Sequence, residues 1–172
     1  YSFRCGPVGA IVLDTGEDKP DDHPSFLGLV DFARFIDEQA RWLDAEITKP
    51  HLKDAPYRLI FCHIPLRWTD ETPPDYANGG YDYFSRRGRD AWQNAIVRWG
   101  AQLVISGPPP QARLLPATEA FPSPQITGGG PKLDSNARLI QVHADPSGLS
   151  LRMLHATTGQ DDFTIDLKPL TT

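Results

Sequence analysis

The sequence is poor in cysteine and contains no long apolar run. Its two cysteines, Cys5 and Cys62, are too few for a disulfide framework and do not form a C-x-x-C pair. We therefore expect both to be small buried hydrophobic residues. No uninterrupted apolar stretch approaches the roughly 20 residues of a membrane span, so the sequence predicts no membrane partner.

Positive charge is also in deficit. The 172 residues include 17 Lys and Arg against 22 Asp and Glu, which gives a formal net charge of -5. This balance argues against nucleic acid as a partner. The sequence also lacks four common motifs: G-x-x-x-x-G-K-[ST], G-x-G-x-x-G, G-x-S-x-G and H-E-x-x-H. It therefore does not predict the nucleotide-binding, hydrolase or protease sites that these particular motifs mark.

Hydrophobic residues make up 40% of the chain, enough for one globular domain with a core. Short apolar runs and segments of helical spacing alternate along it. We predict buried strands over Val8 to Asp14, Tyr57 to Cys62 and Gln102 to Ser106, and helices over Val30 to Ile47 and Arg86 to Trp99. The first residues, Tyr1-Ser2-Phe3, include no initiator Met, so we expect a piece of a longer protein and assign no compartment.

Three alternating strands close the chain, at Leu139 to Ala144, Leu149 to His155 and Phe163 to Leu167. Together with the preceding elements they predict an α/β fold with a mixed β-sheet and helices on one face. Because two helices cover only one face of a sheet, we expect the other face to pack on something absent from this chain.

His63 is the titratable residue of greatest interest. It stands where an apolar strand gives way to a loop, which is the edge at which open α/β sheets place ligands. A neutral imidazole there is a metal ligand or a hydrogen-bonded structural residue, and both interpretations stay open. Asp14 ends the first strand in the same way, with Glu17 and Asp18 close behind, and these carboxylates either converge on the same edge or form turns.

The other candidates have simpler interpretations. Asp21-Asp22-His23 has the D-x-H spacing of a metal site but lies in a loop with no strand to fix it, and no ligand spacing links His51, His143 and His155. The basic cluster Arg86, Arg87 and Arg89 is a phosphate contact or a solvated face. The run Gly128-Gly129-Gly130 is an anion cradle or a turn.

Several blocks, taken in order, resemble calcineurin-like metallophosphoesterases, and most closely those related to purple acid phosphatases. The blocks are YSFRCGPVGAIVLDTGED, FARFIDEQARWLDAEI, RLIFCHIPL, and QLVISG followed by ITGGGP, and they span roughly residues 1 to 131. The resemblance is to the C-terminal half of the family's domain. It implies that residues 1 to 172 are a single domain or a C-terminal segment, folded as half of an αββα sandwich.

The resemblance also implies a chemistry. Family members hold two metal ions, Fe, Mn or Zn, which activate a hydroxide and clamp the leaving oxygen of a phosphoester. Of the family's five ligand blocks, only the lone His that ends a strand has a match, at His63. The D-x-H, G-D-x-x-D and G-N-H-[DE] blocks belong to the N-terminal half, and no catalytic or substrate-binding residue is assigned to this chain.

The fifth ligand block departs from the family pattern. Where G-H-x-H is expected, the sequence has Gly107-Pro108-Pro109-Pro110, and proline offers a metal no side-chain donor. The resemblance therefore predicts part of a metal-dependent phosphohydrolase that is inactive alone and binds its phosphoester in the intact enzyme. The alternative is a metal-free pseudoenzyme or interaction module that keeps the fold. In either case the missing N-terminal half, or a second copy, is expected to cover the bare sheet face.

Overall fold

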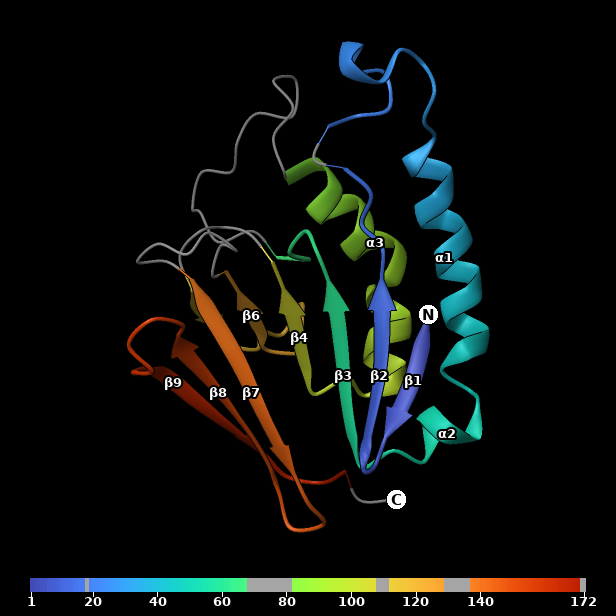
Figure 1. Cartoon of the computed structure of the whole chain (residues 1–172). Helices are drawn as coiled ribbons and strands as arrows, with labels where there is room; N and C mark the ends of the chain where they lie inside the picture. Colours follow the sequence, from blue (N-terminus) through green and yellow to red (C-terminus); the bar gives the residue numbers. More distant parts are fainter. Residues whose placement is uncertain (18, 68–81, 108–111, 129–136, 171–172) are drawn as a thin grey trace.

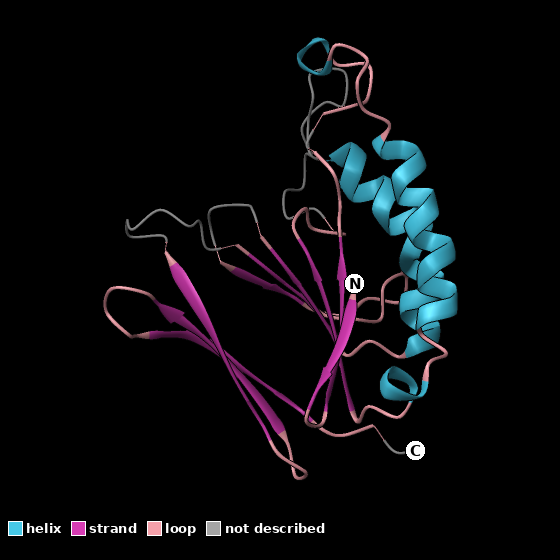
Figure 2. Ribbon diagram, turned by 45° about the vertical axis from the view of Figure 1, so that its right-hand side comes forward, coloured by secondary structure: helices cyan, strands magenta, loops and turns pink. Residues whose placement is uncertain are grey.

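The computed structural model describes residues 1–17, 19–67, 82–107, 112–128 and 137–170. Two sheets and a helical layer make up the fold: helices cover one face of a six-stranded sheet, and a three-stranded sheet lies against the other face (Figure 1). The view in Figure 2 shows the two sheets meeting at one end and diverging at the other. The predicted α/β class is confirmed.

The large sheet is mixed, and its middle is parallel. Its strand order is β1 (Ser2–Cys5), β2 (Val8–Leu13), β3 (Tyr57–Cys62), β4 (Leu103–Ser106), β6 (Gln125–Thr127) and β5 (Arg113–Leu115). Strands β2, β3, β4 and β6 run parallel to one another, and the two edge strands are antiparallel. Strands β2, β3 and β4 are largely apolar because most of their side chains are buried, on one face against the helices and on the other against the small sheet, and this is why the sequence revealed them.

The helical layer consists of α1 (Phe32–Glu46), the single turn α2 (Pro50–Lys53) and α3 (Asp82–Trp99), with a short 3-10 helix η1 (Pro24–Phe26) before α1. Buried residues of α1 and α3, among them Ile36, Leu43 and Trp92, form one core with the sheet face beneath them. The Trp92 indole N–H donates to the carbonyl of Ile36 at 3.1 Å, which ties α3 to α1. Gly100 follows α3 with φ 73°, the left-handed conformation that ends helices.

The last three strands pair with one another as an antiparallel meander, in a sheet of their own. They are β7 (Arg138–Ala144), β8 (Leu149–His155) and β9 (Asp161–Leu167). In the turn between β7 and β8, the Asp145 carboxylate accepts hydrogen bonds from the N–H groups of Ser147 and Gly148. The strand positions agree with the sequence-based expectation. The separate sheet partly covers the large sheet's second face, which we expected to be bare.

The contact between the sheets is a second hydrophobic core. Leu149, Leu151 and Met153 of β8 are buried against Tyr57 and Leu59 of β3 and their neighbours. Toward the carboxyl ends of the parallel strands the sheets separate and leave a cleft of about 990 Å³. No helix in the described part of the chain is long and apolar enough to span a membrane.

The two cysteines behave differently from each other. Cys62 is buried in the helix-side core, as expected. Cys5 is exposed, so the prediction that it is buried is wrong. It ends β1, an edge strand whose last three residues are all exposed, and no sequence pattern indicates that this short strand has a neighbour on one side only.

Candidate functional site

Four chain segments leave the large sheet at the same edge, because β2, β3, β4 and β6 are parallel (Figure 1). The residues that directly follow them are Asp14, His63, Gly107 and Gly128, and all four line the cleft. Convergence of Asp14 and His63 on one edge, one of the two interpretations that the sequence left open, is what the structure has. This is also the edge at which open α/β sheets bind ligands.

His63 is exposed at the mouth of the cleft, and its backbone is fixed to the neighbouring strand. The Gly107 N–H donates to the His63 carbonyl at 2.9 Å. A Cβ atom placed on Gly107 would lie 3.0 Å from His63 Nδ1 and 3.1 Å from the His63 carbonyl oxygen. A side chain at position 107 would therefore force the imidazole or the carbonyl to move by a few tenths of an ångström, whereas glycine leaves both in place.

Two buried polar side chains hold the loop that follows His63. The Thr15 hydroxyl accepts a hydrogen bond from the Ile64 N–H at 3.0 Å. The Gln125 side chain, which is fully buried, accepts from the Arg67 N–H at 3.1 Å and donates to the Arg67 carbonyl at 2.9 Å. Sequence reasoning missed both residues. The available signal was weak: a glutamine directly before the apolar Ile126, in a segment rich in proline.

Asp14 is held as firmly as His63. The Gln39 side chain on α1 accepts from the Asp14 N–H at 2.9 Å and donates to the Asp14 carbonyl at 2.6 Å. One carboxylate oxygen of Asp14 accepts from the Gly16 N–H at 2.9 Å, which is the turn-forming role considered from sequence. The carboxylate is still exposed at the cleft, so Asp14 both forms the turn and faces the same space as His63.

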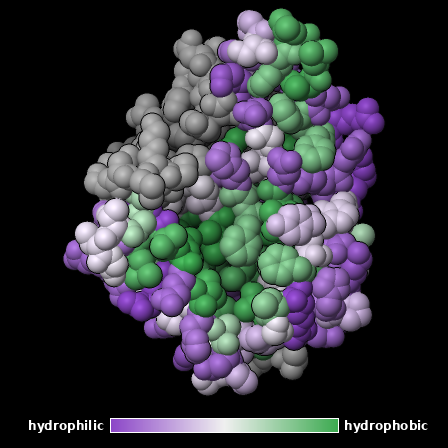
Figure 3. Space-filling view, in the orientation of Figure 1, coloured by the Kyte–Doolittle hydropathy of each residue, from purple (hydrophilic) through white to green (hydrophobic). Residues whose placement is uncertain are grey.

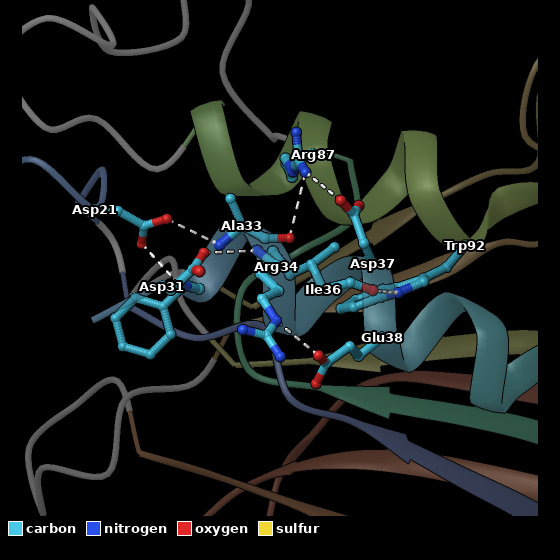
Figure 4. A network of polar contacts seen from close by, with 10 residues as sticks. Asp21, Asp31, Ala33, Arg34, Ile36, Asp37, Glu38, Arg87 and Trp92 are labelled. Carbon is cyan, nitrogen blue, oxygen red and sulfur yellow. Dashed lines mark hydrogen bonds and ion pairs between the residues drawn. The ribbon is translucent and has the colours of Figure 1, made fainter. Parts of the chain in front are cut away.

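The D-x-H spacing at residues 21 to 23 has a structural role. The two carboxylate oxygens of Asp21 accept from the N–H groups of Phe32 and Ala33, at 2.9 and 3.0 Å, and so cap the first turn of α1 (Figure 4). His23 Nδ1 accepts from the Ser25 N–H at 3.2 Å. Both side chains serve the loop and the helix start. Of the two further acidic candidates, Glu17 is exposed and Asp18 lies outside the described residues.

The remaining candidates are dispersed. His51 lies near the Ser2 hydroxyl, His143 pairs with Asp145 at 3.6 Å, and His155 Nδ1 accepts from Thr157. The Arg87 guanidinium donates to the Ala33 carbonyl and to Asp37 on α1, at 3.3 and 2.8 Å (Figure 4). For Arg87, an inter-helix contact thus replaces the phosphate contact considered from sequence.

Two predicted features fall partly outside the described residues. Pro108 and Pro110, at the positions of the family's fifth ligand block, lie outside the described residues. Gly129 and Gly130 of the glycine run also lie outside them. The flanking residues are described: the Gly128 N–H donates to the Gly107 carbonyl at 2.5 Å, which ties the end of β6 to the end of β4.

A metal ion needs more donors than the described residues offer. His63 and Asp14 supply one imidazole and one carboxylate at the same edge, but no group of three or more His, Cys, Asp or Glu side chains able to hold a metal occurs in the described ranges. Structural zinc sites take four ligands, and catalytic ones take three from the protein. The residues described do not form a complete metal site by themselves.

The cleft behind this edge is apolar. Its walls include Val12, Phe61 and Ile105 from the large sheet and Ile140 and Met153 from the small one, and Figure 3 shows the hydrophobic hollow between the two sheets. Asp14 and His63 line it on the side where the parallel strands end, and Arg138 of β7 also belongs to its lining. The arrangement is a polar edge above an apolar surface that the chain leaves partly open.

Comparison with solved structures defines the class of fold. No family model and no curated protein sequence matches this chain. Solved structures of phosphoesterase-like fold match it over nearly its whole length. At the identities found, this shared fold is what the comparison establishes, and it confirms the fold relationship to calcineurin-like metallophosphoesterases that the sequence blocks predicted.

Two of these structures come from a plant purple acid phosphatase and from a Plasmodium protein. The purple acid phosphatase PPD1 from yellow lupin (Lupinus luteus) seeds is 14% identical, with a TM-score of 0.67 over 98% of this chain. GAP50, described as the anchor in the inner membrane complex of Plasmodium, is 12% identical, with a TM-score of 0.58 over 99%. The present chain spans 32% of the first and 53% of the second.

Proposed function

We propose that this chain is the C-terminal part of a metal-dependent phosphohydrolase and supplies His63 to a metal site built mostly by another part of the domain. The observation that carries this proposal is the place of His63: it follows a central parallel strand, it is exposed at the mouth of the cleft, and the fold is phosphoesterase-like. The substrate class would be a phosphoester small molecule. By itself the chain would be inactive.

In this function the chain's own residues position a ligand. Gly107 leaves room for the imidazole, while Thr15 and Gln125 fix the loop that follows it. Ligands held in one orientation before the metal arrives lose less freedom on binding, which favours tight binding. The metal ions would be Fe, Mn or Zn, the ions expected from the family, and would supply Lewis-acid activation of the phosphoester.

The same proposal assigns a partner. The open part of the large sheet, including Val12, Phe61 and Ile105, would be covered by the missing N-terminal half of the domain or by a second copy of this chain. The apolar lining of the cleft supports this, because another polypeptide could bury its own apolar side chains against it.

A second candidate is a metal-free pseudoenzyme or interaction module. It is favoured by the sequence at residues 107 to 110, where Pro108 and Pro110 stand in place of two metal-binding histidines. Proline has no side-chain atom that binds a metal. In that case the fold would have been kept and the fifth ligand block lost, and the proline run would form a rigid surface for a partner.

Metal uptake separates the two candidates. The chain would be equilibrated with Zn²⁺ or Mn²⁺, desalted, and its metal content measured by mass spectrometry, alongside the P108H/P110H double variant and the same variant with His63→Ala. We expect metal gain in the double variant and its loss when His63 is also removed. His143→Ala, which removes an exposed histidine far from this edge, is the matched control and should change nothing.

Metal that persists after the His63→Ala change would contradict the proposal and favour the interaction module, because His63 would then have no metal-binding role at this edge. A double variant that takes up no metal would mean that the missing half of the domain is indispensable for the site.

A further inference from the structure

Two arginines come together on the helix side of the large sheet, away from the cleft. Arg67 belongs to the loop that follows His63, and Arg89 lies in the first half of α3. The residues directly before them are in contact, because a Cβ atom on Gly88 would lie 3.5 Å from Cδ2 of Leu66. The loop and the helix therefore meet next to both arginines.

Both arginines face the segment between β5 and β6. The central carbon of the Arg67 guanidinium lies 5.8 Å from the centre of the Phe121 ring. Gln93 lies one turn after Arg89 on the same face of α3, and its side chain donates a hydrogen bond to the Ala120 carbonyl. This contact places the face of α3 that carries Arg89 beside the segment that Arg67 covers.

The Arg67 guanidinium has most of its hydrogen-bonding capacity unused. It carries five N–H groups, and one of them donates to the Pro116 carbonyl at 2.7 Å. Within the described ranges its guanidinium makes no other hydrogen bond and no ion pair. Partial burial lowers the pKa of this guanidinium, and the nearby positive charge of Arg89 lowers it further. Both effects disfavour its charge, and a bound anion would oppose them.

Arg89 also lacks a strong partner in the described part of the chain. Its Nε atom lies 3.7 Å from Oδ1 of Asp90, which is the next residue and is 67% exposed. Adjacent residues on a helix do not face each other, and exposed ion pairs contribute little. Glu119, the carboxylate of the segment between β5 and β6, is exposed and pairs with neither arginine. Two cations therefore lie near each other without a matching anion.

The other two well-described arginines of α3 show what a paired arginine looks like here. Arg87 and Arg98 form ion pairs with Asp37 and Asp44 of α1. These two arginines lie on one face of α3, whereas Arg89 lies about half a turn away from it. The phosphate contact that the sequence left open for this basic cluster thus remains available to Arg89.

The chemistry of the pair favours an oxyanion with two negative charges. Two neighbouring guanidinium groups repel each other, and a dianion between them compensates both charges, whereas a carboxylate compensates only one. The planar N–H fork of arginine matches the oxygen atoms of phosphate. A phosphate group on a small molecule carries about −1.5 to −2 charges at pH 7. Phosphate therefore fits this pair better than acetate or another carboxylate does.

We propose that Arg67 and Arg89 form a binding site for a tetrahedral oxyanion, which is inorganic phosphate or the phosphate group of a small molecule. The neighbours of this site, Leu66 and Phe121, belong to the helix-side core, whereas the cleft opens between the two sheets (Figure 2). The inference therefore goes beyond the proposed function. A bound anion would join the loop that follows His63 to α3 through charge-assisted hydrogen bonds and so stabilise that loop.

The test titrates the chain with sodium phosphate at constant ionic strength and follows the arginine Nε–H signals by NMR. We expect saturable shifts of the Arg67 and Arg89 signals with phosphate and with sulfate, and much smaller shifts with acetate or chloride. Ionic strength is held constant because salt screens charges that are partly exposed. Phenyl phosphate separates the two sources: tighter binding than phosphate would indicate a small-molecule ligand, and weaker binding would indicate inorganic phosphate.

Three variants locate the site. Arg89→Gln leaves the Arg67 contact with Pro116 in place and should weaken phosphate binding about tenfold, as expected for the loss of a hydrogen bond between charged groups. Arg67→Lys keeps the charge without the planar fork and should also weaken binding. Arg98→Gln, on the α1 side of the same helix, is the matched control and should leave binding unchanged. Cooperative thermal unfolding would verify that each variant is folded.

Three outcomes would overturn the inference: shifts of the Arg67 and Arg89 signals that never saturate, equal shifts with phosphate and acetate, or equal weakening by Arg89→Gln and Arg98→Gln. The first two are measured on the unchanged chain, so they decide the matter even where a variant fails to fold. Metal uptake at His63 is measured separately, with other variants. This inference and the proposed function can therefore fail independently of each other.

Discussion

At the scale of single residues, the candidate site depends on one glycine. Gly107 lies so close to His63 that a side chain there would press on both the imidazole and the carbonyl, which would have to move by a few tenths of an ångström. The backbones of Asp14 and His63 are likewise held by groups from distant segments, namely the Gln39 side chain and the Gly107 N–H. The chemistry of this edge therefore depends on contacts that no local sequence pattern reveals.

The first prediction is that Gly107→Ala lowers stability and moves His63. Its Cβ would lie 3.0 Å from His63 Nδ1, so we expect a loss of about 1–3 kcal/mol in the free energy of unfolding, as for other overpacked sites. Urea denaturation measures this loss. In the P108H/P110H background, the same change should also weaken metal uptake.

Gly148→Ala is the matched control for that prediction. The nearest atom to a Cβ at position 148 is the Leu167 carbonyl oxygen at 3.9 Å, an ordinary contact distance. We expect its effect on the free energy of unfolding to stay within about 0.5 kcal/mol, the usual range for surface changes. Equal losses for both variants would mean that the His63 contact is not what makes position 107 sensitive.

The second prediction concerns the two thiols. Burial raises the pKa of the Cys62 thiol to about 12, so at pH 8 only about one molecule in ten thousand carries the thiolate that reacts with alkylating reagents. Cys5 is exposed. Iodoacetamide should add one group to the native chain and two to the chain in urea, as measured by intact mass. Two rapid additions to the native protein would show that Cys62 is accessible.

The same shift has a consequence for stability at high pH. An unfolded chain releases the Cys62 proton near pH 9, whereas the folded chain keeps it until about pH 12. Between these values the folded state binds more protons than the unfolded state, so stability falls as pH rises. The contribution is fully present below pH 9. In Cys62→Ala the free energy of unfolding should decline less steeply over this range.

At the scale of elements, the sequence predicted the longer pieces well. Continuous apolar runs identified β2, β3 and β4, because strands covered on both faces need no polar positions. Helical periodicity identified α1 and α3, although α3 begins at Asp82, four residues before the predicted start. The three-residue strands β5 and β6 were missed, since two or three residues carry no period.

The pairing of elements was harder to predict than their type. An alternating strand pattern shows that one face is buried but does not tell which sheet the strand joins, so the separation of β7–β9 into a sheet of their own was not foreseen. The same reason explains why His63 and Asp14 were found and Gln125 was not. Strand ends can be located from the sequence, whereas the Gln125 contact with Arg67 spans 58 positions.

The third prediction tests how the start of α1 is fixed. Asp21 caps its first turn through hydrogen bonds to the Phe32 and Ala33 N–H groups (Figure 4), and Asp21→Ala should lower the free energy of unfolding by about 1–2 kcal/mol, as loss of a helix cap does. Thermal unfolding by circular dichroism measures it. The exposed neighbour Asp22 is the control, and Asp22→Ala should have almost no effect. Similar losses for both would indicate a general charge effect of the loop.

At the scale of the whole molecule, the two sheets form a wedge. They share a core where β8 lies on β3, and they separate toward the edge that carries His63 (Figure 2). This shape places the polar edge and the open apolar surface at the same end of the molecule. A unit that filled the cleft would bring its own groups next to His63 and Asp14.

The last prediction measures the wedge directly, with two side chains on the same face of β3. Leu59 is 2% exposed beneath β8, whereas Phe61, two positions closer to His63, is only partly buried beside the cleft. In urea denaturation, Leu59→Ala should cost about 2–5 kcal/mol of stability, the range for buried leucine. Phe61→Ala should cost clearly less, even though it removes more atoms, because solvent already reaches the ring. If Phe61→Ala proved the more damaging change, solvent would not reach the ring, and the cleft between the two sheets would be closed in solution.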